Sequence, residues 1–330
     1  MSSNPVCSVI MSVFNGSDYL TESIDSILNQ SFQDFELIII NDASTDSSET
    51  IIRSYQDERI KLINNETNVG LAASLNIALK KSQGEFIARM DDDDIAMEDR
   101  LSEQITFLQQ NPEVGIVGSY AELYGSTSGL RIHALSSDEL KIRTLFSCQF
   151  CHPTVMFRKA LIDGENVKYD ESFKTAQDFE LWSRIVSLTN FATIPKVLLK
   201  YRVHSNQISI AKRDKQIEAT SLIYAKILNN LAIYPTDNDI ELHNSLANLN
   251  FYQDELQLKY IGAYLINIIE SNQKKRIFPI KPFEKFLAEY YYNILQNSTE
   301  KKINRLKYYE MFKFQTYYNP KFRRLKQLLK

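Results

Sequence analysis

Short, nearly continuous apolar runs alternate with amphipathic stretches in the first 125 residues of the chain. Such runs are typical of strands buried on both faces, whereas apolar residues that recur every three or four positions are typical of helices. The predicted strands are residues 6–13, 35–40, 60–63 and 86–90, and the predicted helices between them start near Leu20, Asp46 and Leu71. This alternating order predicts an α/β fold with a mostly parallel sheet flanked by helices.

The pattern loosens after residue 125 but still predicts regular elements. The expected helices are residues 98–110, 136–145 and 178–188, and the expected strands are residues 115–123, a part of 146–157, and 197–203. Long runs with helical spacing follow at residues 217–231, 240–269 and 283–295. We therefore expect an α/β domain at residues 1–210 and a helical region at residues 211–330.

Composition adds little to this picture. The 330 residues are 44% hydrophobic and 24% charged, with a formal net charge of −3, which is ordinary for a globular protein and gives no overall bias toward nucleic acid. Cys7, Cys148 and Cys151 form an odd set, which favours a reducing compartment over a disulfide framework. The sequence shows neither a signal-peptide pattern at its start nor an apolar run of membrane-spanning length, so a cytoplasmic protein is expected.

Four consecutive carboxylates, Asp91 to Asp94, follow the apolar run at residues 86–90. Adjacent like charges repel one another, and folding alone gives no reason to place them at the end of a buried strand. A hard divalent cation bound to phosphate oxygens would offset the repulsion, because such cations prefer carboxylate ligands. A solvated acidic loop is the simpler interpretation. Open α/β sheets bind ligands at the carboxyl ends of their strands, however, which favours a ligand site.

Two further aspartates stand at positions suited to chemistry. Asp42 follows the strand predicted at residues 35–40, so it belongs at the same sheet edge as the Asp91–Asp94 run. Its carboxylate could accept a hydrogen bond from a base N–H or a ribose hydroxyl. Asp178 begins a predicted helix, where the helix dipole favours an ionised carboxylate that can act as a base. The simpler interpretation of Asp178 is an N-cap.

Four ordered blocks of sequence carry a resemblance to a known family. The blocks are SVIMSVFN at residues 8–15, ELIIINDASTD at residues 36–46, NVGLA at residues 68–72 and GEFIARMDDDD at residues 84–94. In order and spacing, over about residues 6–210, they resemble the inverting GT-A glycosyltransferases of family 2. The resemblance implies sugar transfer from a nucleotide-sugar donor, with a UDP-sugar favoured, by an enzyme that uses a divalent metal, Mn2+ or Mg2+.

The resemblance also implies roles for residues on the donor side. Phe14 falls where the family carries an aromatic residue near the nucleotide base, and Asp42 where it carries the base-binding aspartate. Asp91 matches the first aspartate of the family's Asp-x-Asp motif, near the ribose. Asp92 is grouped with these donor-binding residues, although its side chain could be a solvated spacer. By this resemblance, residues 1–125 form the nucleotide-sugar half of the domain and residues 126–210 the acceptor half.

The same resemblance implies which residues bind the metal and which residue is the catalytic base. Asp93 matches the metal-binding aspartate of the motif, Asp94 a further acid often found there, and His204 a histidine that can approach the metal or the diphosphate. Asp178 matches the catalytic base, although Gln177 replaces the acid or glycine that usually precedes it. The base would take a proton from an acceptor hydroxyl, which then attacks the anomeric carbon with inversion. The expected acceptor is a glycan or a lipid-linked glycan in surface polysaccharide biosynthesis.

The segment Cys148-x-x-Cys151-His152 is ambiguous. Two cysteines and a histidine could begin a zinc site, but no second pair of ligands follows at suitable spacing. In a reducing compartment, packed and reduced thiols are the favoured interpretation. His152 also begins a block that in the family often lines the acceptor side.

Residues 301–330 carry ten lysines or arginines against one acid, Glu310, and are rich in aromatic residues. This segment either docks on an anionic membrane surface, with aromatic side chains at the interface, or forms a solvated helix pair or a homo-oligomer interface. The first alternative would place the protein on the inner face of the plasma membrane as a peripheral protein. No nucleic-acid-binding module accompanies the charge, so nucleic acid is not an expected partner.

Two other function classes share the aspartate run. A phosphatase with an Asp-x-Asp nucleophile would place that strand near the start of its domain, whereas several β-α units precede it here. A non-catalytic module that binds nucleotide sugars or docks on membranes is disfavoured because Asp42, Asp91, Asp93 and Asp178 are retained together. No Gly-x-Gly-x-x-Gly motif follows the first strand and no P-loop is present, which disfavours a dinucleotide-dependent oxidoreductase or a P-loop enzyme.

Overall fold

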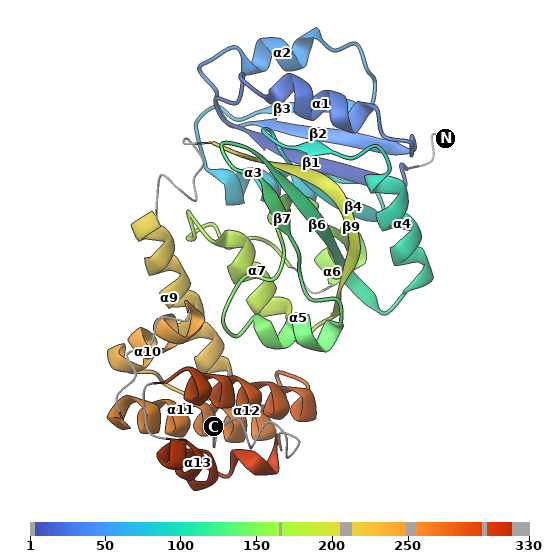
Figure 1. Ribbon diagram of the computed structural model, residues 1–330. Helices are drawn as coiled ribbons and strands as arrows, with labels where there is room; N and C mark the ends of the chain where they lie inside the picture. Colours follow the sequence, from blue (N-terminus) through green and yellow to red (C-terminus); the bar gives the residue numbers. More distant parts are fainter. Residues whose placement is uncertain (1–3, 165–166, 205–212, 249–254, 299–301, 319–330) are drawn as a thin grey trace. The chain divides into compact units, whose positions relative to one another are not determined.

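The computed structural model describes residues 4–318 apart from 165–166, 205–212, 249–254 and 299–301 (Figure 1). It consists of two compact units, one formed by residues 1–140 and 148–220 and the other by residues 141–147 and 221–330. The expected boundary at residue 210 lies outside the described residues. Among the helices that the structure describes, none is long and apolar enough to cross a membrane.

Four parallel strands form the N-terminal half of the sheet in the first unit, in the order β3-β2-β1-β4. Each lies where the apolar pattern predicts a strand. The strands are β1 (Cys7–Val13), β2 (Phe35–Asn41), β3 (Ile60–Asn64) and β4 (Phe86–Asp91), and the helices that connect them are α1 (Leu20–Leu28), α2 (Ser48–Ser54) and α3 (Leu71–Lys81).

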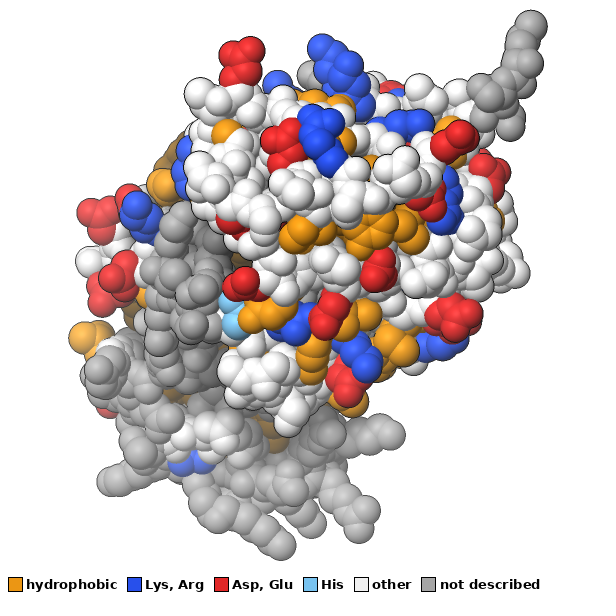
Figure 2. Space-filling view, turned by 90° about the horizontal axis from the view of Figure 1, so that it is seen from above, with side chains coloured by type: hydrophobic (Ala, Val, Ile, Leu, Met, Phe, Trp, Pro, Cys, Tyr) orange, Lys and Arg blue, Asp and Glu red, His pale blue; other side chains and the backbone are white. Residues whose placement is uncertain are grey.

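Both faces of β1, β2 and β4 are covered, which explains why these strands are largely apolar along their length, whereas the edge strand β3 is partly exposed. Val9 and Met11 of β1 pack in one core with Ile24 of α1 and Ile105 of α4 (Arg100–Gln110). The helix α3 packs against the opposite face of β1 and β2, and Figure 1 shows α1 and α2 above the sheet and α3 below it. On the described part of the face seen from above, acidic and basic side chains are interspersed (Figure 2).

The sheet is mixed beyond β4. Among the described residues it has nine strands in all, and β8 runs antiparallel to both β4 and β6, whereas β9 runs parallel to β6. The very short β5 pairs antiparallel with β9, and β7 pairs antiparallel with β6. These strands are β5 (Ile95–Ala96), β6 (Val114–Gly125), β7 (Gly129–Arg131), β8 (Met156–Arg158) and β9 (Asn190–Val203).

Three short helices lie within residues 126–210, where the acceptor half is predicted, although residues 141–143 of the first helix belong to the second unit. Two strand predictions need adjustment in this region. The helices are α5 (Ser137–Arg143), α6 (Lys159–Gly164) and α7 (Gln177–Ile185). The strand expected within residues 146–157 is confined to β8, because a 3-10 turn, η1 (His152–Thr154), precedes it. The strand β9 begins at Asn190, well before the predicted residue 197, and its parallel pairing with β6, which is interrupted by register shifts, accounts for the extra length.

The second unit is helical among its described residues, as the sequence predicts. The run expected at residues 240–269 is divided between two helices, the first of which begins at a capping box formed by Thr236 and Asp239. The elements are α9 (Arg213–Asn230), which begins in the first unit, α10 (Asp237–Ala247), α11 (Glu255–Lys275), α12 (Ile280–Asn297), α13 (Lys302–Met311) and η2 (Phe314–Thr316).

Half of the described aromatic side chains of the basic C-terminal segment are buried, and Phe312, Tyr317 and Tyr318 are partly exposed. Tyr308, Tyr309 and Phe314 are buried, and the ring of Phe314 lies 4.7 Å from that of Tyr291 on α12. Phe322 lies outside the described residues. The buried aromatic side chains therefore belong to the core of the helical unit and are not available to insert into a membrane surface.

Candidate active site

A turn between two strands holds the aspartate run. β4 ends at Asp91 and β5 begins at Ile95, so residues 92–94 form the connection. β4 is paired with β1 up to Asp91, and β5 is paired with β9 through Ile95 and Lys200. The two pairings fix the turn at both ends, at the carboxyl edge of the parallel strands. This is the place where open α/β sheets bind ligands.

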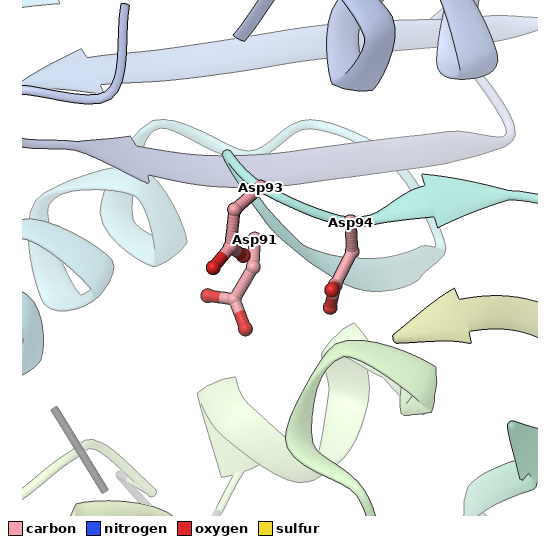
Figure 3. Close-up of side chains that lie close together, drawn as sticks. All are labelled: Asp91, Asp93 and Asp94. Carbon is pink, nitrogen blue, oxygen red and sulfur yellow. The ribbon is translucent and has the colours of Figure 1, made fainter. Parts of the chain in front are cut away.

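Three carboxylates of this turn converge. Oxygen atoms of Asp91, Asp93 and Asp94 all lie within 4.8 Å of one another, and the three side chains extend to the same side of the turn (Figure 3). Burial and the neighbouring carboxylates raise the pKa values of Asp91 and Asp94. Asp94 Oδ1 accepts a hydrogen bond from the backbone N–H of Arg202 at 2.8 Å, whereas its buried Oδ2 has no hydrogen-bond partner among the described residues. Oxygen-only ligands with an unsatisfied buried oxygen fit a hard divalent cation such as Mn2+ or Mg2+.

The end of β9 supports this cluster from the other side. Arg202 donates from Nε to the carbonyl oxygen of Asp93 at 2.8 Å, and its guanidinium stacks on the rings of Tyr19 and Tyr124 at 4.1 and 4.6 Å. His204 Nε2 lies 2.9 Å from Asp93 Oδ2. The structure therefore brings His204 into contact with the aspartate predicted to bind metal, at a distance where the imidazole could join the ligand set.

Asp42 is buried and its carboxylate is already hydrogen-bonded. Only 1% of the residue is exposed, and its two oxygens accept from the backbone N–H groups of Val69 at 3.0 Å and Gly70 at 2.8 Å, and from Asn65 Nδ2 at 2.7 Å. Gly70 has a φ of 92°, a conformation that disfavours any side chain. In this structure Asp42 holds the turn before α3, so any contact with a nucleotide base comes in addition to that role.

Phe14 is 50% exposed directly after β1, so its ring is free to stack on a ligand. The backbone that follows is tied to the loop after β2: Asn15 N donates to Ser44 Oγ at 3.0 Å, and Asn15 Oδ1 accepts from Thr45 N at 2.8 Å. Asp92 is not part of the carboxylate cluster, and its Oδ2 lies so close to Gly16 that a side chain at that position would clash with it. Asp92 therefore lies against the Gly16 backbone at the start of this loop.

Asp178 is the second residue of α7, which begins directly after Ala176, a residue with a left-handed φ of 54°. Burial raises its pKa, and the backbone N–H of Phe179 and the Cys148 thiol oppose that rise. Burial and the helix N-terminus therefore act on this carboxylate in opposite directions. The charge of Asp178 contributes to the raised pKa of Asp91, which places the predicted base within electrostatic range of the aspartate turn.

The Cys148-x-x-Cys151-His152 segment makes contacts of a different kind from a zinc site. Cys148 Sγ lies 3.4 Å from Asp178 Oδ2, and His152 Nε2 lies 2.8 Å from the hydroxyl of Tyr169. Among the described residues, the group that could hold a metal is the aspartate cluster, and it contains neither cysteine. Burial raises the pKa of the Cys151 thiol to about 12, in agreement with packed, reduced cysteines.

Three residues of this site escaped the sequence-based prediction, namely Arg89, Cys148 as a partner of Asp178, and Arg202. Arg89 is 2% exposed on β4, and its guanidinium forms an ion pair with Asp91. The sequence contained a signal that could have identified Arg89 as a site residue, because a lone arginine inside the apolar run 86–90 falls on the same strand face as Asp91. The contacts of Cys148 and Arg202 join residues far apart in the sequence, and no local pattern predicts them.

Comparisons with known proteins agree with this geometry. The sequence model of the family "Glycosyl transferase family 2" matches residues 8–163. An uncharacterised glycosyltransferase of Haemophilus influenzae is 31% identical over 303 residues, which cover 87% of this chain and 92% of the relative.

Two solved structures resemble the chain in fold. TarS of S. aureus, in complex with UDP-GlcNAc, gives a TM-score of 0.58 at 19% identity and covers 94% of this chain and 91% of that chain. The mannosyltransferase PcManGT of Pyrobaculum calidifontis, in complex with GDP-Man and Mn2+, gives 0.57 at 17% identity and covers 99% and 87%.

The family match contains β1 through β8 and hence Asp42 and the whole aspartate turn, whereas Asp178 and His204 lie beyond it. The H. influenzae relative extends the similarity over most of the chain. With a sheet of the GT-A type and a relative of this length and identity, the chain belongs to glycosyltransferase family 2 and is a glycosyltransferase.

Proposed function

We propose that the protein is a metal-dependent, inverting glycosyltransferase that moves a sugar from a nucleotide-diphosphate sugar to a hydroxyl of a glycan or a lipid-linked acceptor. The observation that carries the proposal is the convergence of three carboxylates, Asp91, Asp93 and Asp94, at the carboxyl edge of the sheet. Asp178 on α7 is close enough for its charge to contribute to the raised pKa of Asp91. A phosphatase or a non-catalytic module is disfavoured by the family assignment and by the retention of this complete set.

Asp91, Asp93 and Asp94, with His204 beside them, are the residues that would hold the metal. A divalent cation bound there would neutralise the diphosphate and so favour its departure as an anion. The chain contributes by holding these ligands in place. Arg202 fixes the backbone of Asp93 and the carboxylate of Asp94, and the pairing of β5 with β9 prevents the turn from relaxing away from its like charges.

Asp178 is the proposed general base. A carboxylate whose pKa is raised by burial is a stronger proton acceptor than an exposed one, provided that it stays ionised at the working pH. The Cys148 thiol, 3.4 Å from Asp178 Oδ2, donates to the ionised form and orients it. Asp178 would take the proton of an acceptor hydroxyl as that oxygen attacks the anomeric carbon from the face opposite the nucleotide, which inverts the configuration.

A UDP-sugar is our favoured donor, in line with the UDP-GlcNAc bound by TarS, although PcManGT binds GDP-Man. The exposed ring of Phe14 would stack on the base, and the loop after β2 would flank it. For the acceptor we propose a surface polysaccharide or its lipid-linked precursor. Because Tyr308, Tyr309 and Phe314 are buried, they would not take part in a membrane contact, which would depend mainly on the basic side chains of the C-terminal segment.

A thermal-shift screen tests the proposal. UDP-, GDP-, dTDP- and CMP-sugars are each added with and without Mn2+, since a ligand that binds only the folded state raises the melting temperature with the logarithm of its concentration. We expect one nucleotide class to stabilise the protein, and to do so more strongly with Mn2+. The absence of a metal-dependent shift with every donor would refute the proposal.

A further inference from the structure

Arg89 is a buried charge with unused hydrogen-bond donors. Only 2% of the residue is exposed, and its guanidinium is paired with Asp91. Nε and Nη1 have no hydrogen-bond partner among the described residues. An arginine offers five N–H donors in a rigid fork, and leaving charged donors unpaired in a protein interior is costly. Such a group is expected to meet a ligand or ordered water in the working enzyme.

A second arginine close by shows that this is not a general property of buried arginines in this fold. Arg100 on α4 is 0% exposed, and all three of its guanidinium nitrogens are engaged. Nε donates to Gln104 Oε1 at 3.1 Å, Nη2 to the Arg89 carbonyl oxygen at 2.7 Å, and Nη1 lies 3.3 Å from Met90 Sδ. The fold thus satisfies the donors of Arg100 from within, but not those of Arg89.

The surroundings of Arg89 indicate what a ligand there would be. On its strand, Arg89 shares a face with Asp91, at one side of the carboxylate cluster. Burial raises the pKa values of Asp178 and Tyr169, and the Arg89 charge opposes both rises, so the guanidinium also lies near the proposed base. In a transfer with inversion, the sugar must lie between the diphosphate and the base that activates the acceptor. Arg89 is paired with a residue of the carboxylate cluster and its charge acts on the proposed base, so it lies near both of the groups between which the sugar must be held.

We propose that Arg89 binds the transferred sugar of the donor, with Nε and Nη1 donating hydrogen bonds to one or two of its oxygen atoms while the ion pair with Asp91 holds the fork in place. This inference rests on the proposed function. It assigns Arg89 to recognition of the sugar and not of the nucleotide or the metal. The ligand class is a polar sugar oxygen that can accept, such as a hydroxyl or an N-acetyl carbonyl.

The test compares nucleotide with nucleotide-sugar binding in matched variants. Dissociation constants for UDP and UDP-GlcNAc, and for GDP and GDP-mannose, are measured with Mn2+ by calorimetry for the wild type, Arg89→Lys and Arg100→Lys. Arg89→Lys keeps the charge beside Asp91 but loses the planar fork. We expect it to weaken binding of the nucleotide sugar about tenfold or more relative to the free nucleotide, the usual effect of losing hydrogen bonds from a charged donor. Arg100→Lys should leave this ratio unchanged.

The possible results distinguish a failure of the proposed function from a failure of the inference about Arg89. A wild-type protein that binds none of these ligands overturns the proposed function, and the inference with it. A wild-type protein that binds a donor, together with an Arg89→Lys protein that keeps the wild-type ratio, overturns the inference alone and shows that Arg89 is structural.

If the melting curve shows that Arg89→Lys does not fold, the inference is tested on the wild type instead. Its affinity is then measured for deoxy analogues of the donor that it binds best. The inference requires that removal of at least one sugar hydroxyl or of the N-acetyl group weakens binding about tenfold. Equal affinity for all analogues overturns it.

Discussion

Two buried polar networks in this protein differ in how many of their polar atoms have hydrogen-bond partners. At the aspartate turn, Asp94 Oδ2 and two nitrogens of Arg89 are buried without hydrogen-bond partners among the described residues. In the helical unit, His243 is 0% exposed, and both its ring nitrogens are engaged, Nδ1 with the Tyr264 hydroxyl at 2.7 Å and Nε2 with the Leu145 carbonyl at 2.8 Å.

The difference separates a site built for a ligand from one built for stability. A buried polar group without a partner lowers stability and is retained where a ligand can satisfy it, whereas a paired group specifies one packing arrangement. The carbonyl of Leu145 can only accept, so His243 carries its proton on Nε2, and Nδ1 accepts from Tyr264. Changes at the turn should therefore act on binding and catalysis, and changes at His243 on folding.

The largest effect is expected from Asp178→Asn. The amide keeps the size of the side chain but cannot take a proton, so the transfer rate should fall by a factor of about 100 to 10,000. The melting temperature should stay near that of the wild type, because no ion pair is lost. The rate is measured as release of nucleoside diphosphate once donor and acceptor are known.

Asp163→Asn makes the same chemical change at an exposed position on α6 and should leave the rate unchanged. An Asp178→Asn protein that transfers sugar at the wild-type rate would remove Asp178 from the mechanism. Cys148 would then be left as a partner of a structural carboxylate.

His243→Ala should destabilise the helical unit by about 3 to 4 kcal/mol, because it leaves a cavity among Phe146, Tyr224 and Tyr264 and removes two buried hydrogen bonds. Nucleotide-sugar affinity should not change. Urea denaturation followed by circular dichroism gives the first quantity, and calorimetry the second.

His133→Ala is the matched control, because Nε2 of that partly exposed histidine has no hydrogen-bond partner among the described residues. It should cost much less stability than His243→Ala. Equal losses in the two variants would contradict the distinction drawn for His243.

The same regions show how much of the structure could be predicted from the sequence. The four strands β1 to β4 and the helices between them were predictable, because the strands are short, mostly apolar runs and three of them, β1, β2 and β4, are buried along nearly their whole length. The aspartate turn was predictable because residues at the carboxyl ends of parallel strands gather on one edge. The partners of Asp42 and the contact between Arg202 and Asp93 were not, since they depend on how distant segments meet. Nor could a local pattern show that residues 141–147 belong to the helical unit.

A pH titration of stability should report His243 directly. Burial lowers its pKa to about 4, below the ordinary value of 6.5. Between these values the unfolded chain binds a proton that the folded state rejects, so the stabilisation is complete above about pH 6.5 and is lost as the pH falls toward 4. The loss amounts to at most about 3 kcal/mol. His243→Phe should flatten this part of the stability curve, and an unchanged slope in the variant would show that other groups cause it.

The smallest effect is expected from Asp94→Asn. Whether this variant is more or less stable than the wild type without metal tests the comparison between the aspartate turn and the His243 network most directly. Replacing one of three clustered carboxylates with a neutral amide of the same shape removes repulsion from Asp91 and Asp93 and can keep the bond from the Arg202 backbone. The metal-free protein should become more stable by about 1 kcal/mol, as is common where a site carries strain for function.

The same variant should lose most of the stabilisation by Mn2+ in the thermal-shift screen, because a hard cation binds a neutral amide less well than a carboxylate. His243→Phe in the same assay should keep the Mn2+ shift at whatever melting temperature it has. If Asp94→Asn proved less stable without metal and still responded fully to Mn2+, the unpaired oxygen of Asp94 would be structural. The turn would then differ from the helical unit only in having fewer hydrogen bonds.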